Sequence, residues 1–305
     1  MISDNGRGAL ILTLSMGVFA INDALIKLAF QTVSVAQGLV VRSAVASVLI
    51  IIIAWRTGAL AYKIPRSDRW PMILRMVGEV SGNACFLIAL AAMPLANAAA
   101  ILQAVPLALT MAAALILREQ VGWRRWSAIA VGFAGVLIII RPGSDGFDIN
   151  AIFALAAVFC VTVRDIATRR LTPATPGVLP AGASALSLAV AGLVAVPFVT
   201  WTPMTLNLWA LLAGAGVLVV VGYITNVASM RIGDVSAVSP FRYTLLVWAF
   251  FFSAVIFGDT PDALTLTGGA IVVSAGLYTL FREKVRGQDI ATRSSDRPSG
   301  PGAND

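Results

Sequence analysis

Histidine is absent from this 305-residue sequence. That absence removes the side chain that most often serves as general base, proton relay or metal ligand near neutral pH. The sequence has no GxxxxGK[ST] phosphate loop for direct use of ATP, no nucleophile elbow and no Cys/His metal spacing. The two cysteines, Cys85 and Cys160, lie inside apolar stretches and are expected to be free small hydrophobes. We therefore expect no catalytic residue, metal or cofactor, and no enzyme activity.

Charged residues are also scarce. They make up 12% of the chain, while 58% of it is hydrophobic; a soluble domain has about 25% charged residues. So few charges could not cover the surface of a soluble protein, and so many apolar residues exclude intrinsic disorder. A polytopic membrane protein remains, with the lipid bilayer as its main partner.

Long apolar runs dominate what is present. A membrane-spanning helix needs about 20 mostly apolar residues, and the sequence has ten such windows: 8–29, 36–55, 70–92, 95–117, 124–141, 149–169, 178–200, 207–230, 235–257 and 264–282. The sequence therefore predicts an all-α integral membrane protein with ten transmembrane helices. The polar residues 283–305 are expected to form a disordered cytoplasmic tail.

Basic residues are unevenly distributed between the connections. If the N-terminus is cytoplasmic, the inside connections hold most of them, among them Arg56, Arg118 and Arg231, and the outside connections hold only Arg141. This asymmetry follows the positive-inside rule and predicts that both termini are cytoplasmic. The net charge of +7 then reflects topology, so nucleic acid is not an expected partner.

The two halves of the chain resemble each other at a spacing of about 140 residues. Residues 8–141 match residues 149–282, with Glu119 opposite Asp259 at the ends of equivalent helices. Helices rich in Ala, Leu and Gly can look alike by composition, but here the register also holds across charged residues. Each half has five spans, an odd number, so the halves are expected to be inverted repeats around a central cavity, as in secondary transporters.

The stretch LQAVPLALTMAAALILREQVGWRRWSAIAVGFAGVLIIIRPG resembles the end of an EamA repeat in the drug/metabolite transporter superfamily. The residues that carry the resemblance are Pro106, Glu119, Trp126, Gly132 and Gly135, together with FAINDALIKLAF near the start of the chain and Arg42 after it. The second half departs from the pattern, because Pro240 lies about six residues earlier than a match to Pro106 requires and Asp259 stands where glutamate is usual.

The resemblance implies ten helices in a bacterial inner membrane and transport of small organic metabolites by alternating access. Ten-helix exporters of amino acids, including aromatic ones, are the first expectation for function. Uptake of a cofactor-like solute is the alternative, because S-adenosylmethionine carriers share a DAxxK-like first helix, here Asp23 to Lys27. A channel or a membrane enzyme would be a different class, although the sequence has no pore loop.

Ionisable residues inside a span are costly and indicate a functional site. In the first span, Asn22, Asp23 and Lys27 are candidates; the two charges are one turn apart and either neutralise each other or serve as a gate or substrate contact. In the third span, Arg75, Glu79 and Asn83 form one stripe at four-residue spacing, with Glu79 roughly 14 Å deep. Either Arg75 simply neutralises Glu79, or Glu79 is the first candidate for a proton carrier.

Further polar and aromatic candidates for substrate binding or gating are Arg42, Gln103, Tyr223, Asn226, Arg242, Tyr243 and Trp248. Arg42 and Arg164 could instead extend to the membrane interface, and Trp248 could simply pack. The interior holds two more basic residues than acidic ones: Lys27, Arg42, Arg75, Arg164 and Arg242 against Asp23, Glu79 and Asp165. That surplus predicts an amphipathic small-molecule substrate with a carboxylate, which arginine binds in bidentate geometry. A monomer is compatible with these expectations.

Overall fold

The computed structural model is helical throughout the residues it describes, which are 3–116, 118–119, 121–142, 148–172 and 174–295. Ten helical spans within these residues are long and apolar enough to cross a membrane, and no strand occurs among them. The predicted all-α fold with ten transmembrane helices is therefore confirmed.

Each half of the chain contributes five spans. The first half consists of α1 (Asp4–Phe30), α2 (Val35–Arg56), α3 (Arg66–Ala92), α4 (Leu95–Leu102) followed by α5 (Val105–Ile116), and α6 (Trp123–Ile140). The second half consists of α7 (Ala151–Arg169), α8 (Val178–Ala195), α9 (Leu206–Ile232), α10 (Val235–Val238) with the 3-10 turn η3 (Ser239–Tyr243) and α11 (Thr244–Phe257), and α12 (Ala263–Ser295). The short 3-10 turns η1 (Ala59–Ala61) and η2 (Val196–Phe198) follow α2 and α8.

Local sequence explains where several helices begin and end. The side chains of Ser3, Ser34 and Thr205 accept a hydrogen bond from the first turn of α1, α2 and α9, as N-cap residues do. Gly258 ends α11 with a φ of 70°, a left-handed conformation that glycine adopts without a steric penalty.

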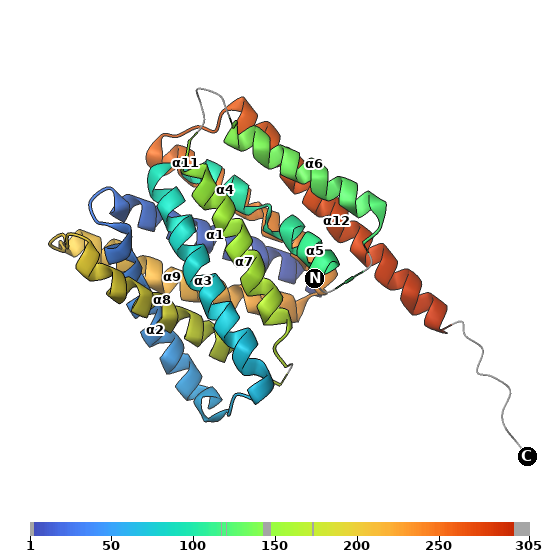
Figure 1. Cartoon of the computed structure of the whole chain (residues 1–305), viewed down its shortest axis with the longest axis horizontal. Helices are drawn as coiled ribbons and strands as arrows, with labels where there is room; N and C mark the ends of the chain where they lie inside the picture. The colour runs from blue at the N-terminus through green and yellow to red at the C-terminus, as the bar shows by residue number, and fades with distance from the viewer. Residues whose placement is uncertain (1–2, 117, 120, 143–147, 173, 296–305) are drawn as a thin grey trace, which may run out of the picture.

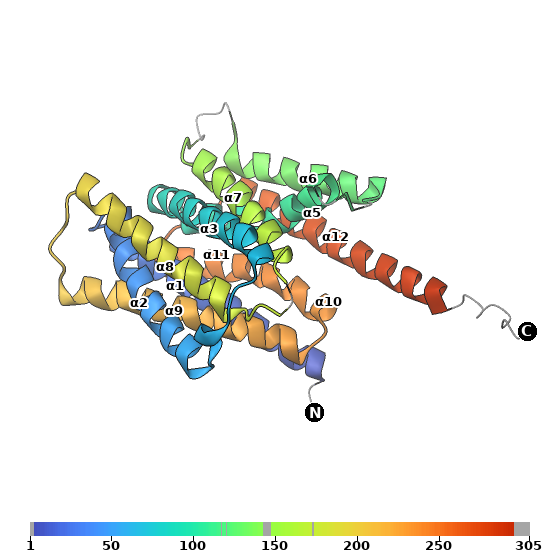
Figure 2. The same cartoon turned by 60° about the horizontal axis from the view of Figure 1, so that its bottom comes forward.

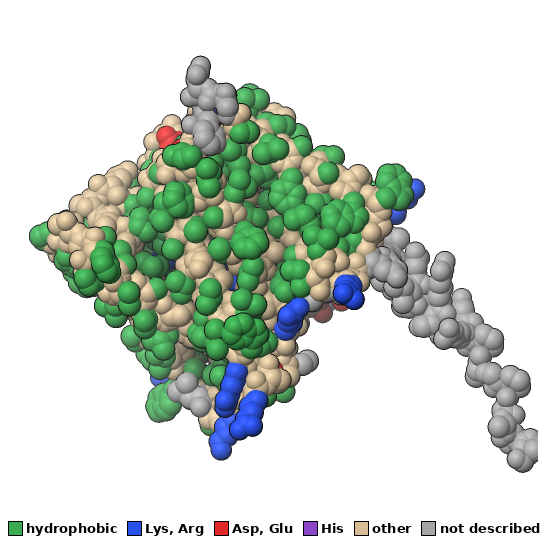
Figure 3. All heavy atoms as spheres, viewed as in Figure 1, with side chains coloured by type: hydrophobic (Ala, Val, Ile, Leu, Met, Phe, Trp, Pro, Cys, Tyr) green, Lys and Arg blue, Asp and Glu red, His purple; other side chains and the backbone are tan. Residues whose placement is uncertain are grey.

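The surface is that of a membrane protein. Apolar side chains cover the face shown in Figure 3, and the Lys and Arg side chains visible there lie along its lower and right edges. The exposed apolar residues include Leu115, Phe159 and Val247 from three different helices. Lipid is the solvent that makes such a surface stable, so the chain is a multi-pass membrane protein.

Helices of the two halves pack against each other in a reciprocal pattern. The main pairs are α1 with α9, α3 with α7, α2 with α8, and α6 with α12. Helices α1 and α7 are the first of their halves, and α3 and α9 are the third. The α1–α9 pair and the α3–α7 pair are therefore equivalent, since each joins the first helix of one half to the third helix of the other. Figure 1 shows α3 beside α7 and α6 beside α12, and Figure 2 separates α2, α8 and α9 from α6 and α12.

The fourth span of each half is interrupted. In the first half, the break falls at Gln103 and Ala104, just before Pro106; in the second half, η3 contains Pro240. Proline has no N–H to continue the helical hydrogen bonds, so both breaks have a local cause. The two breaks meet, because Nε2 of Gln103 donates to the carbonyl of Tyr243 at 3.3 Å.

A loop before α12 joins the two halves at one end of the bundle. The Asp262 carboxylate accepts hydrogen bonds from the Thr265 N–H, at 2.9 Å, and from Arg141 at the end of α6. Hydrogen bonds from Thr265 and Arg141 lower the pKa of Asp262 to about 2. Asp262 is therefore ionised at neutral pH, and its ion pair links α6 to the start of α12.

The structure differs from the predicted disordered tail over its first part. Helix α12 continues to Ser295, so residues 283–295 are helical, and residues 296–305 lie outside the described residues. The segment up to Ser295 contains one glycine and no proline, so nothing in it breaks the helix that begins in the membrane.

Glycines allow α3 and α7 to approach closely. A Cβ added to Gly78 would lie 2.9 Å from the backbone N of Arg164 and 2.9 Å from the backbone O of Cys160. Backbone atoms cannot move aside as a side chain can. We therefore expect Gly78→Ala to lower the free energy of unfolding by about 1–3 kcal/mol, measured by denaturant titration of the detergent-purified protein.

Gly214→Ala in α9 is the matched control. A Cβ there would meet only Leu25 Cδ1 at 3.6 Å, an ordinary contact. Its effect should be within about 1 kcal/mol or stabilising, and equal losses in the two variants would contradict the close-packing account.

Candidate functional site

Glu79 lies at the contact between α3 and α7 and is 2% exposed. Its Oε2 is 3.4 Å from Nη1 of Arg164 and 4.0 Å from Nη2 of Arg75. Nδ2 of Asn83 donates to its other oxygen at 2.9 Å. A carboxylate this deep is stable only when charge and hydrogen-bond partners compensate it, and Glu79 has both.

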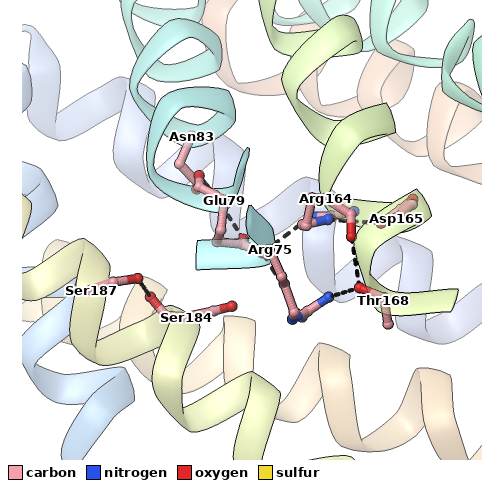
Figure 4. A network of polar contacts seen from close by, with 8 residues as sticks. All are labelled: Arg75, Glu79, Asn83, Arg164, Asp165, Thr168, Ser184 and Ser187. Carbon is pink, nitrogen blue, oxygen red and sulfur yellow. Dashed lines mark hydrogen bonds and ion pairs between the residues drawn. The ribbon is translucent and has the colours of Figure 1, made fainter. Parts of the chain in front are cut away.

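The network continues along α7 (Figure 4). Nε of Arg164 donates to Asp165 at 2.8 Å. Arg75 donates to Oγ1 of Thr168, and that hydroxyl donates to the Arg164 carbonyl at 2.8 Å. The predicted α3 stripe of Arg75, Glu79 and Asn83 is thus real, and it meets a matching stripe on α7 from the other half of the chain.

A cavity of about 190 Å³ opens beside this network. Its polar lining consists of Arg42, Ser43, Arg75, Glu79, Asn83, Ser184 and Tyr223, and its apolar lining includes Ala46, Ile50, Leu188 and Val219. Two buried polar atoms of this lining, Nε of Arg75 and Oγ of Ser184, have no hydrogen-bond partner in the described structure. Unsatisfied buried donors in a cavity are positions where a ligand oxygen fits.

Arg42 projects into this interior and is 8% exposed. Asp23, Tyr223 and Glu79 interact electrostatically with its guanidinium. Arg42 lines the cavity, and Arg164 pairs with Glu79 and Asp165; these contacts favour a place in the site over the snorkelling alternative. The cavity lining itself holds two guanidiniums, those of Arg42 and Arg75, and one carboxylate, that of Glu79.

The first span does not contain the predicted Asp23–Lys27 ion pair. Nζ of Lys27 donates to the carbonyls of Leu90 and Met93, at 2.9 and 2.6 Å, and lies 5.6 Å from the Phe257 ring centroid. The unpaired carbonyls at the C-terminus of α3 attract this cation. Asp23 instead accepts a hydrogen bond from Nδ2 of Asn22 at 2.8 Å.

The remaining candidates divide between structure and site. Gln103 and Tyr243 hold the two interrupted helices together, and Trp248 packs on α1, where its Nε1 donates to the Thr13 carbonyl at 2.9 Å. Arg242 lies in electrostatic range of Asp165 and Arg164. Oδ1 of Asn226 is buried without a hydrogen-bond partner in the described structure, yet Asn226 does not line the cavity.

Sequence reasoning counted Arg164 and Asp165 among the interior charges but did not choose them for substrate binding or gating. It missed Thr168 and Ser184. Arg164 and Asp165 carried a signal, because both are charged within a span, and their part in the site depends on the α3–α7 contact. Thr168 and Ser184 carried none, since a single hydroxyl in an apolar helix is common and usually bonds to its own backbone. Among the described residues, no group of three or more acidic or cysteine side chains could hold a metal ion.

Comparison with known proteins shows that the chain is similar to transporters. The model of the EamA-like transporter family matches residues 6–141 and again residues 149–282, close to the two predicted repeats. A solved crystal structure with a TM-score of 0.62 is 18% identical and covers 92% of this chain and 98% of its own, so the fold is shared.

Similar curated proteins transport different metabolites. The pseudopaline exporter of Pseudomonas aeruginosa is 28% identical over 88% of this chain and 94% of its own. The S-adenosylmethionine uptake transporter of Rickettsia bellii is 27% identical, and the riboflavin transporter of Vibrio cholerae is 30% identical, each over 70% of this chain and 72% of its own. These relatives are transporters and not enzymes, which confirms the expectation that this chain is not an enzyme.

Removal of the Glu79 carboxylate should be costly, because it leaves Arg75 without its ion-pair partner and leaves Arg164 paired with Asp165 alone. We expect Glu79→Ala to lower the free energy of unfolding by about 3–5 kcal/mol. Glu119→Ala removes an exposed ion pair with Arg169, at 3.8 Å, and should cost at most about 1 kcal/mol. Denaturant titration of both variants measures these two losses of unfolding free energy. Equal losses would mean that Glu79 does not stabilise the contact between α3 and α7.

Proposed function

Because the chain belongs to the EamA-like transporter family, we propose that it is a secondary transporter that exports small carboxylate-bearing metabolites, amino acids first among them. The observation that carries this proposal is the cavity beside Glu79, where Arg42 and Arg75 outnumber the single carboxylate. A substrate carboxylate gives the two guanidiniums of the lining a second acidic partner. The same carboxylate accepts hydrogen bonds from Nε of Arg75 and Oγ of Ser184, two donors without a partner in the described structure.

The lining of the cavity supports an amphipathic substrate. Its charged residues come from α2 and α3, and its apolar residues Ala46, Ile50, Leu188 and Val219 come from α2, α8 and α9. A carboxylate faces the arginines in this arrangement, and an apolar or aromatic side chain packs against these apolar residues. Pockets that combine a few fixed polar groups with apolar surface select ligands in this way.

The mechanism is alternating access between two inverted halves. The reciprocal helix pairs of the two halves support it, as do two interrupted helices that meet near the centre. In such transporters one half rocks against the other around a shared central site. The positive-inside distribution supports cytoplasmic termini in a bacterial inner membrane.

Uptake of a cofactor-like solute such as S-adenosylmethionine is the second candidate. Relatives named as S-adenosylmethionine uptake transporters favour it. Such a solute is larger than an amino acid and requires the cavity of about 190 Å³ to widen. A channel is disfavoured, because the polar cluster is closed by ion pairs and contains no ring of repeated ligands.

The deciding experiment uses purified protein in liposomes loaded with a mixture of the common L-amino acids, with efflux of each followed by mass spectrometry. We expect saturable, selective efflux that includes aromatic amino acids. If no amino acid leaves the vesicles while S-adenosylmethionine enters them, the second candidate replaces the first.

Arg42 should determine the preference for a carboxylate. Loss of a hydrogen bond to a charged group costs about 1.5–3 kcal/mol, so Arg42→Gln should raise KM for the exported amino acid about ten- to hundredfold. The control is the amino-acid amide, which lacks the carboxylate and should be transported poorly by the wild type. Equal transport of the acid and its amide would contradict a carboxylate site at Arg42.

A further inference from the structure

A groove of about 390 Å³ lies beside the central cavity. Its lining comes from α8, α9 and α2, and α2 packs against both of the other helices; it is named the α8–α9 groove below. The groove and the cavity beside Glu79 are continuous, because five residues line both: Ile50, Gly177, Ala181, Tyr223 and Val227. A solute in the groove therefore has a path to the cavity that crosses no packed helix contact.

Helix α8 separates from α2 toward the end of the bundle at which the groove lies. A Cβ added to Gly192 would lie 2.8 Å from Cγ2 and 3.0 Å from the backbone N of Val40. Earlier in the helix, a Cβ on Gly182 would meet only Ile50 Cγ2, at 3.3 Å. On Gly177, directly before α8, it would meet no atom within 4 Å. The close contact between the two helices is thus confined to the end near Gly192.

That closed end is fastened by a buried glutamine. Gln37, in the first turn of α2, is 0% exposed. Its Nε2 donates to the Thr202 carbonyl at 2.7 Å, and its Oε1 accepts from the Thr202 N–H at 3.0 Å. The loop between α8 and α9, at the left in Figure 2, is therefore bound to α2. The open end is that of Arg56 and Arg231, which the positive-inside rule predicts to be cytoplasmic.

Among the described residues that line the groove, one is charged. It is Arg231, in the last turn of α9, which is exposed and makes no ion pair in the described structure. Val227 and Ile224, about one and two turns before it, are 53% and 52% exposed. A free guanidinium binds a carboxylate, and exposed apolar side chains beside it cover an apolar substituent. The groove is therefore complementary to the amphipathic acid that the cavity selects.

We propose that the transported solute enters the central cavity through the α8–α9 groove, with Arg231 as the first contact of its carboxylate. This inference rests on the proposed function and adds the route of the substrate and a further residue that recognises it. The carboxylate moves from Arg231 to Arg42 and Arg75, while the apolar part remains among apolar side chains of the groove and the cavity. Gly177 lies at the junction, so the size of the side chain there controls entry. In this account the structure is the inward-facing state.

The route can be tested without any substrate. Ser184 lines the cavity but not the groove, so Ser184→Cys in a Cys85→Ala, Cys160→Ala background reports access to the cavity. A membrane-impermeant thiol reagent is applied to the cytoplasmic face of inside-out membrane vesicles, and the rate of labelling is measured. Labelling should become slower in the order Gly177→Ala, Gly177→Leu, Gly177→Trp, with most of it lost in Gly177→Trp.

Gly122→Trp is the matched control. Like Gly177, Gly122 directly precedes a helix, and an added Cβ would meet no atom within 4 Å. It lies before α6 and lines neither the groove nor the cavity, so the labelling rate should not change. If Gly177→Trp does not fold, Gly177→Leu takes its place. Labelling of Ser184→Cys that stays unchanged in the folded Gly177 variant would overturn the route.

The role of Arg231 is tested in proteoliposomes with the amino acid that gives the largest efflux. At low salt, Arg231→Gln should raise KM about two- to fivefold, as loss of an exposed ion pair does, and leave kcat unchanged. The difference should disappear at high salt. Arg56→Gln, at the end of α2 and outside the lining of the groove, is the control and should leave KM unchanged.

Equal KM values for Arg231→Gln and Arg56→Gln would overturn the carboxylate contact at Arg231. If the wild type transports no amino acid, the proposed function fails, while the labelling of Ser184→Cys still decides whether the groove is the way into the cavity.

Discussion

The structure depends on one buried carboxylate held between two guanidiniums. Glu79 on α3 is compensated by Arg75 on its own helix and by Arg164 on α7, so a single charge cluster joins the two halves of the chain. In the membrane interior each of these charges alone would be very costly. Their mutual compensation fixes the α3–α7 contact, which the glycines of α3 make close enough to form, and it places the arginine side chains at the edge of the cavity.

Much of the fold could be predicted from the sequence, because a bilayer imposes simple rules. Span length and the scarcity of charge predict ten helices, and all ten are present. The α3 stripe could also be predicted, since residues four apart share one helical face. The same rule was wrong for Asp23 and Lys27. Their spacing allows a pair, but the free carbonyls of Leu90 and Met93 lie closer to the lysine.

Contacts between distant helices could not be predicted from one sequence. Arg164 and Thr168 belong to the cluster only because α7 packs on α3, and Ser184 reaches the cavity only because α8 packs on α2. The interrupted helices show the same limit. Pro106 and Pro240 do not align between the halves, yet each loosens its helix at a point where Gln103 and Tyr243 meet. The position of each break depends on which backbone hydrogen bonds the proline removes and on which side chains or carbonyls of other helices then bind the freed groups.

The central claim is that the cavity beside the Glu79 cluster binds the transported solute. Ala181 lines that cavity, and the chain has two native cysteines, so Ala181→Cys can be made in a Cys85→Ala, Cys160→Ala background. The measurement is the rate at which a membrane-impermeant thiol reagent on the cytoplasmic side labels this position. Slower labelling at saturating transported amino acid is the result the account predicts, and labelling that the solute leaves unchanged would contradict it.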